Sequence, residues 1–159
     1  YDAFAHTAVR VRESDELDIN DPQAKEELKS RGMTFFDVMK YSSPHDLVAK
    51  EIISGFPLTR YTADLLFSSH NDKCQISQVF LTLLSEYPDT FIAKKFGSHA
   101  SEKVRDMAIM VKKGSMTLEE LDNYCLMNGY NPGSLADIMI SGIYIALGEG
   151  WQWDHDCIQ

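Results

Sequence analysis

Apolar residues recur at helical spacing along most of this chain. Between Ile76 and Tyr87 they stand at i, i+3, i+4, i+7, i+8 and i+11, which places them on one face of a helix. The stretch Ala100–Val111 has similar spacing, and Gly114 after it is a common type of helix end. No segment alternates apolar and polar residues as a half-buried strand does. The pattern predicts an all-α fold, with residues 1–159 forming a single multi-helix bundle.

Proline and capping signals predict where further helices begin. In chain order these predicted starts are Asp2, Asp21-Pro22 (with a helix reaching Gly32), Ser43-Pro44 (with a helix reaching Gly55), Phe56-Pro57, and Thr117, where Glu120 completes a capping box. The acidic stretch between Arg12 and Asp21 is predicted to be a surface loop, and the tail after Gly148 is expected to pack back through its two tryptophans.

The segment Leu135–Leu147 is apolar nearly all round, so we expect it to be the buried central helix of the bundle. Ser141 and Gly142 interrupt it, and no apolar run reaches the length of a membrane span. The sequence therefore predicts a protein without a transmembrane segment.

A polar motif, Asn131-Pro132-Gly133-Ser134-Leu135-Ala136-Asp137, precedes and opens this central helix. A turn of this kind directs backbone N–H groups and the positive end of a helix dipole toward one point, which suits a phosphate. The alternative is that Ser134 caps the helix and Asp137 completes a capping box in place of the usual Glu or Gln. Caps are far commoner than phosphate sites, so the local residues alone favour the cap.

Two other polar clusters also have structural explanations. Asp46 and Lys50 stand at i and i+4, the spacing of a surface ion pair on a helix. Asp89 is a plausible helix cap, and Lys94 with Lys95 follows near the end of that helix, where cations favour the dipole. Neither cluster requires a ligand.

Charge and cysteine content exclude several classes of protein. With 24 acidic and 15 basic residues the net charge is −9, which disfavours broad binding to nucleic acid. The three cysteines, Cys74, Cys125 and Cys157, are far apart and odd in number, as in a reduced cytoplasmic protein. The tail Asp154–Cys157 has metal-binding residue types but lacks the second shell that holds a metal site.

Common catalytic motifs are missing from the sequence: it has no P-loop, no dinucleotide-binding glycine motif and no nucleophile elbow. The chain also begins at Tyr1 inside an amphipathic pattern, so we expect it to be the C-terminal part of a longer protein.

Three of these segments, in this order, resemble the triphosphoribosyl-dephospho-CoA synthase family, closest to its archaeal-type branch. They are Asp46–Glu51, Pro88–Lys95 with Gly97, and Asn131–Asp137. The stretch Leu28–Met39 is similar too, and the likeness covers about the C-terminal half of the family's usual length.

The resemblance implies a transferase that joins the ribose of ATP to the ribose of dephospho-CoA, releases adenine and keeps the triphosphate. It implies ATP as a substrate, a dephospho-CoA-like acceptor, and Mg²⁺ with the triphosphate. Carried onto matching positions, it implies that Lys50, Lys94, Lys95, Asn131, Gly133 and Ser134 bind the nucleotide, and that Asp46, Asp89 and Asp137 serve as metal ligands or general base. Asp46, Asp89, Lys94 and Asp137 are then expected to converge on one cleft.

One departure from the family and two alternatives stay open. Where decarboxylase-associated members often have Arg and Gly-Gly, this chain has Lys94-Lys95-Phe96-Gly97, and a lysine is a point charge rather than a bidentate fork. The first alternative is a family member acting on another precursor, as in pterin or C1-carrier metabolism. The second is a non-catalytic helical subunit that needs a separate N-terminal half or partner chain.

Overall fold

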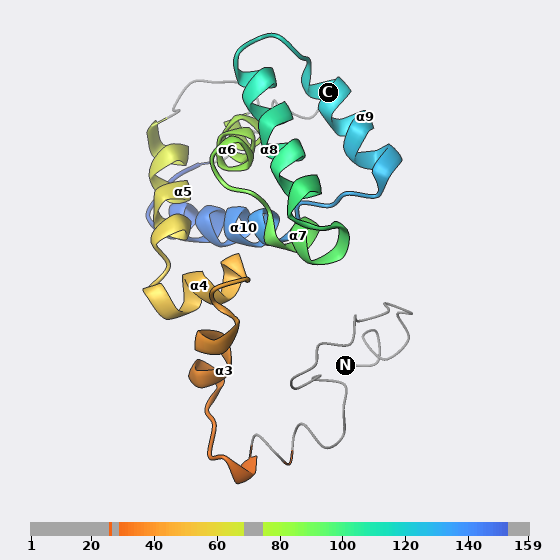
Figure 1. Cartoon of the computed structure of the whole chain (residues 1–159). Coiled ribbons are helices and arrows are strands. Elements are labelled where there is room, and N and C mark those ends of the chain that lie inside the picture. The colour runs from red at the N-terminus through yellow and green to blue at the C-terminus, as the bar shows by residue number, and fades with distance from the viewer. Residues whose placement is uncertain (1–25, 27–28, 69–74, 153–159) are drawn as a thin grey trace, which may run out of the picture. The chain divides into compact units, whose positions relative to one another are not determined.

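The computed structural model describes residues 26, 29–68 and 75–152, and every regular element in these ranges is a helix (Figure 1). The helices are α3 (Phe35–Ser42), α4 (Leu47–Ser54), α5 (Pro57–Ser68), α6 (Gln75–Glu86), α7 (Thr90–Phe96), α8 (Ser98–Lys112), α9 (Leu118–Asn128) and α10 (Gly133–Gly148). The all-α prediction is confirmed.

The chain divides into two compact units, Tyr1–Val38 and Met39–Gln159. In the first unit, Thr34 donates from its N–H and its hydroxyl to the carboxylate of Asp37, which supports the start of α3. The helix predicted from Asp2, the loop between Arg12 and Asp21, the start at Asp21 and the tail Asp154–Cys157 lie outside the described residues. The single domain over 1–159 stays a prediction.

In the second unit, α10 runs crosswise beneath α6 and α8, with its N-terminal end beside α7 and with α5 packed across it (Figure 1). α8 also packs on α6, α7 and α9. The core between α5, α6, α8 and α10 contains side chains that are fully buried, among them Leu66, Leu83, Val104 and Leu135. This packing fixes where the N-terminal end of α10 lies.

Helix boundaries follow the sequence signals with one correction. α5 begins at Pro57, and the capping box of Thr117 is formed, as predicted. α4 does not begin at Ser43-Pro44: its N-cap is Asp46, whose carboxylate accepts the N–H of Ala49. The Ser43 hydroxyl instead donates back to the carbonyl of Lys40 at the end of α3.

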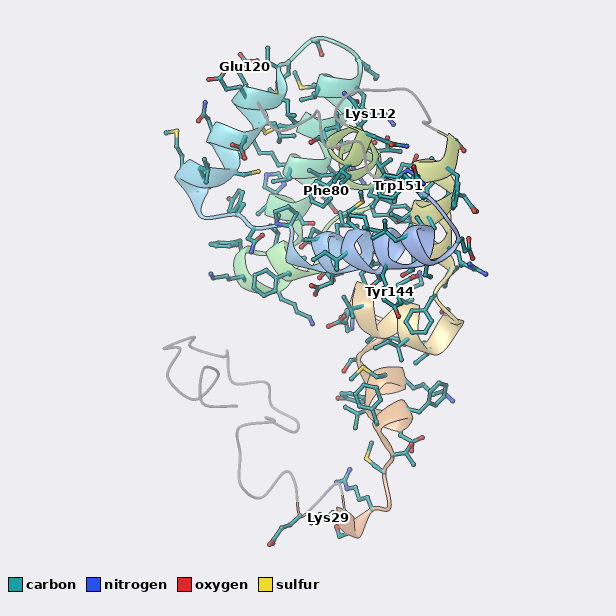
Figure 2. All side chains as sticks on the ribbon, turned by 180° about the vertical axis from the view of Figure 1, so that it is seen from behind. Lys29, Phe80, Lys112, Glu120, Tyr144 and Trp151 are labelled. Carbon is teal, nitrogen blue, oxygen red and sulfur yellow. The ribbon has the colours of Figure 1, made fainter. Side chains whose placement is uncertain are left out.

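The prediction of a fully buried α10 is only partly right. One side packs closely on α5: a methyl group added at Gly142 would lie 2.5 Å from Cγ2 of Thr62. The other side carries Ile140, Tyr144 and Leu147, all of which are exposed; Tyr144 is labelled in Figure 2. None of the described helices combines the length and apolarity needed to cross a bilayer.

Candidate functional site

The first residues of α4, α7 and α10 meet at one point, which we call the three-helix junction. The Leu47 N–H donates to the Thr90 hydroxyl at 3.0 Å, and that hydroxyl shares a hydrogen bond of 2.9 Å with the hydroxyl of Ser134. These contacts join the three polar segments singled out from the sequence, which lie more than 40 residues apart along the chain. The sequence analysis missed Thr90, the residue that links them.

Asp89 is the buried centre of this junction and caps two helices at once. One carboxylate oxygen accepts the N–H of Ile92 in α7 at 2.9 Å, and the other accepts the N–H of Leu135 in α10 at 2.8 Å. Its carbonyl also accepts the hydroxyl of Ser101 in α8 at 2.7 Å. Only 1% of Asp89 is exposed, so its carboxylate holds helix ends together rather than facing solvent.

The environment of Asp89 shifts its pKa upward. Burial disfavours the charged carboxylate and is the largest influence, while N–H groups of Ile92, Leu135, Phe91 and Ser134 oppose it by stabilising the anion. The positive ends of two helix dipoles also favour a negative charge at this position. The carboxylate is thus costly to bury, and its hydrogen bonds and the dipoles offset part of that cost.

The N-terminus of α10 corrects both interpretations of its motif. Ser134 does not cap the helix, Asp137 forms no capping box, and the N-cap is Pro132, which makes no side-chain cap bond. The expected spare N–H groups are absent in this part of the structure. Those of Gly133 and Ala136 donate to backbone carbonyls, while those of Ser134 and Leu135 face Asp89. The turn does attract an anion, but that anion is a carboxylate of the same chain.

Asp46 lies beside the junction and has two partners. One oxygen accepts the Ala49 N–H at 2.9 Å, and the other forms an ion pair with Lys94 of α7. The predicted pair with Lys50 is wrong, because Asp46 is the N-cap of α4 and its side chain turns to α7 instead. Burial raises the pKa of Asp46, but the bonds from Lys94 and Ala49 outweigh it and lower the pKa below its ordinary value.

Several polar side chains on the segments that meet at the junction face solvent. The Nζ atom of Lys95 lies 5.3 Å from the centre of the Phe96 ring. That ring packs edge-on against the ring of Tyr130, with 4.8 Å between the two ring centres. Among the described residues, neither Lys95 nor Lys50 has a carboxylate partner. The other exposed candidates are Asn131 and Asp137. The lysines are therefore available to an anionic ligand.

Gly133 has a packing role at the junction. A methyl group added there would lie 3.4 Å from the ring of Phe91, so the glycine lets this ring approach the start of α10. Asp137 stands one turn further along α10, and its carboxylate makes no hydrogen bond or ion pair with the described part of the chain. Asp46, Asp89 and Lys94 gather at the junction; the convergence of Asp137 with them on one cleft stays a prediction.

The three aspartates do not form a metal site built by the protein. Within residues 26, 29–68 and 75–152, no three His, Cys, Asp or Glu side chains lie close enough to hold one ion. Asp89 uses both oxygens for helix N–H groups, and Asp46 uses both for Ala49 and Lys94. Asp137 alone offers an uncommitted carboxylate.

Glu51 is a second buried carboxylate that the sequence analysis did not identify. It accepts the N–H groups of Leu58 and Thr59 and the hydroxyl of Thr59, so it caps the start of α5. The signal was an acidic residue near the end of α4, where the helix dipole disfavours negative charge. Here the carboxylate is stabilised by the N–H groups at the start of α5, which it accepts.

Comparisons with known proteins show which proteins this chain is similar to. The family model described as ATP:dephospho-CoA triphosphoribosyl transferase matches residues 1–156. A crystal structure from Archaeoglobus fulgidus, assigned as a triphosphoribosyl-dephospho-CoA synthase, is 31% identical with a TM-score of 0.74. The match covers 85% of this chain and 61% of that one, so the chain spans about three fifths of the length of that structure. No curated protein matches.

Proposed function

This chain belongs to the ATP:dephospho-CoA triphosphoribosyl transferase family, and we propose that it acts in the transfer of a triphosphoribosyl group from ATP to dephospho-CoA. A ribose hydroxyl of dephospho-CoA would attack C1′ of the ATP ribose. The C1′–N9 bond breaks, adenine leaves with the bonding electrons, and the hydroxyl proton passes to a base or to the adenine. The triphosphate stays on the product.

One observation carries this proposal: the three family-like segments meet at the three-helix junction, and the helices α4 and α7 that start there carry Lys50, Lys94 and Lys95 in a chain of net charge −9. In such an acidic protein, cations without carboxylate partners favour binding of a compact anion. We assign Lys95 and Lys50 to the triphosphate, with Lys94 held in place by Asp46. Asn131, whose side chain is exposed, remains a proposed contact of the nucleotide, whereas Gly133 and Ser134 leave the proposal because their N–H groups are donated within the chain.

The carboxylates take different roles in this proposal. Asp89 is a positioning residue, because its oxygens join α7 to α10. Asp137 is the favoured candidate for the general base, since its carboxylate is exposed and uncommitted. Magnesium enters only as a companion of the triphosphate, whose oxygens supply most ligands of Mg²⁺ bound with ATP. We place the reaction in the cytoplasm.

ATP binding measured by calorimetry tests the proposed site. Replacing Lys95 with alanine removes one charge-assisted contact, so we expect ATP to bind about 10-fold more weakly. Lys113 is the matched control: it follows the far end of α8, roughly 22 Å of helix away from α7, and Lys113→Ala is expected to bind ATP like the wild type.

Release of adenine tests the reaction itself. With ATP and dephospho-CoA, chromatography is expected to show one adenine for each triphosphoribosyl product. If ATP binds but dephospho-CoA yields no adenine, the acceptor is a different precursor. If ATP does not bind under conditions in which the A. fulgidus protein binds it, or if Lys95→Ala binds as well as the wild type, the proposed site is wrong.

A further inference from the structure

Phe96 is an exposed aromatic residue at the end of α7, and its ring contacts the ammonium group of Lys95. The Nζ atom of Lys95 lies over this ring, 5.3 Å from its centre, which is within the range of a cation–π interaction. Residues that follow one another in a helix do not face each other, so their adjacency does not impose this contact. The Lys95 side chain therefore lies back over the ring instead of extending into water.

The Phe96 ring is held in turn by the connection from α9 to α10, which passes beside α7 (Figure 1). The ring packs edge-on against Tyr130, with 63° between the two ring planes. A methyl group added at Gly129 would lie 4.0 Å from Cζ of the ring, so the ring also lies against the turn after α9. Tyr130 directly precedes the Asn131–Asp137 motif. The ring thus fixes Lys95 relative to the start of that motif.

A lysine that nothing holds is a weak anchor for an anion. Its charge lies at the end of a flexible four-carbon stem, and a ligand that binds it must restrict this stem. Among the described residues Lys95 has no carboxylate partner, so its contact with the ring is what restricts it. We propose that Phe96 is a positioning residue: its ring holds the ammonium group of Lys95 in place for the triphosphate of ATP. This inference rests on the proposed function, which assigns Lys95 to the triphosphate.

Stacking of the Phe96 ring on the adenine base is a poorer fit to the structure. Phe96 is 40% exposed, so a base could reach it. However, the ammonium group of Lys95 lies over the ring and Tyr130 packs edge-on against it. A base that stacked on the ring would compete with the lysine that is assigned to the triphosphate. The two roles differ in whether the effect of the ring depends on Lys95.

A double-mutant cycle measured by calorimetry with ATP tests this dependence. Phe96→Leu keeps an apolar side chain against Tyr130 but removes the aromatic ring, so we expect ATP to bind about 3-fold more weakly. Phe96→Tyr keeps the ring and is expected to bind ATP as the wild type does. In a chain that already carries Lys95→Ala, adding Phe96→Leu is expected to have no further effect, because the ring acts only through the lysine.

Inorganic triphosphate is the second probe, since it carries the phosphates without a base. Phe96→Leu is expected to weaken its binding by the same factor of about 3. Lys103 of α8 is the matched control, because its Nζ atom lies 5.0 Å from the centre of the Tyr124 ring and is held in the same way. Lys103→Ala is expected to bind both probes as the wild type does.

Two results would overturn the inference and leave the proposed function standing. The first is a Phe96→Leu variant that binds ATP as tightly as the wild type although Lys95→Ala weakens binding. The second is a Phe96→Leu variant that weakens ATP binding equally with and without Lys95 and leaves inorganic triphosphate unaffected, because the ring would then bind the base. If Lys95→Ala itself binds ATP as the wild type does, the proposed site is wrong and the inference fails with it.

Discussion

Replacing Asp89 with alanine removes the one side chain that caps both α7 and α10. The substitution leaves the N–H groups of Ile92 and Leu135 without their acceptor, in a place where Asp89 is only 1% exposed. Water has little access to replace the lost carboxylate. The expected effect is therefore larger than the loss of an ordinary cap.

The magnitude follows from the contacts. Losing a helix cap costs about 1 kcal/mol, so two caps cost about 2 kcal/mol. A buried N–H group without an acceptor costs about 1 to 3 kcal/mol where water cannot reach it. The cap estimate and the buried N–H estimate describe partly the same loss, so they are not added in full. Together they give a loss of unfolding free energy of about 3 kcal/mol for Asp89→Ala. Asp89→Asn keeps one acceptor oxygen, so its loss should lie between wild type and alanine.

Urea unfolding followed by far-ultraviolet circular dichroism measures this loss. Thr117→Ala is the matched control, since Thr117 caps the single helix α9 at an exposed position and its loss should cost about 1 kcal/mol. If Asp89→Ala costs no more than Thr117→Ala, with unchanged dependence on urea, the double-cap interpretation of Asp89 is refuted.

Two further predictions test packing and charge. Gly142→Ala should destabilise by about 1 to 3 kcal/mol in urea unfolding, because the new methyl group would overlap Thr62; Gly148→Ala meets open space and should be neutral or slightly stabilising. The lowered pKa of Asp46 means that the unfolded chain takes up this proton first as the pH falls. The stability difference between wild type and Asp46→Asn should thus persist above about pH 4 and decline below it, and a difference that is flat with pH would contradict the Lys94 pair.

Local sequence signals predicted most of the helices because their causes are local. The apolar spacing from Ile76 fixes α6, Pro57 starts α5, and the Thr117 hydroxyl with Glu120 starts α9. α4 was misplaced because Ser43-Pro44 and Asp46 are both acceptable starts by local criteria. Asp46 is the N-cap, and its other oxygen pairs with Lys94, 48 residues away, a partner that no local signal indicates.

The candidate site was predicted less completely, because its contacts are long-range. The sequence identified the three segments but assigned the cap of α10 to Ser134. The cap comes from Asp89, 46 residues earlier in the chain. No local pattern reports such a contact, and the same is true of the link that Thr90 makes between Leu47 and Ser134.

Hydrogen–deuterium exchange with and without ATP tests most directly whether the three-helix junction forms a nucleotide site. The account predicts slower exchange at the starts of α4 and α7 and in the connection from α9 to α10, with no change near Lys113. Unchanged exchange at all three segments, or protection confined to the far end of α8, would contradict it.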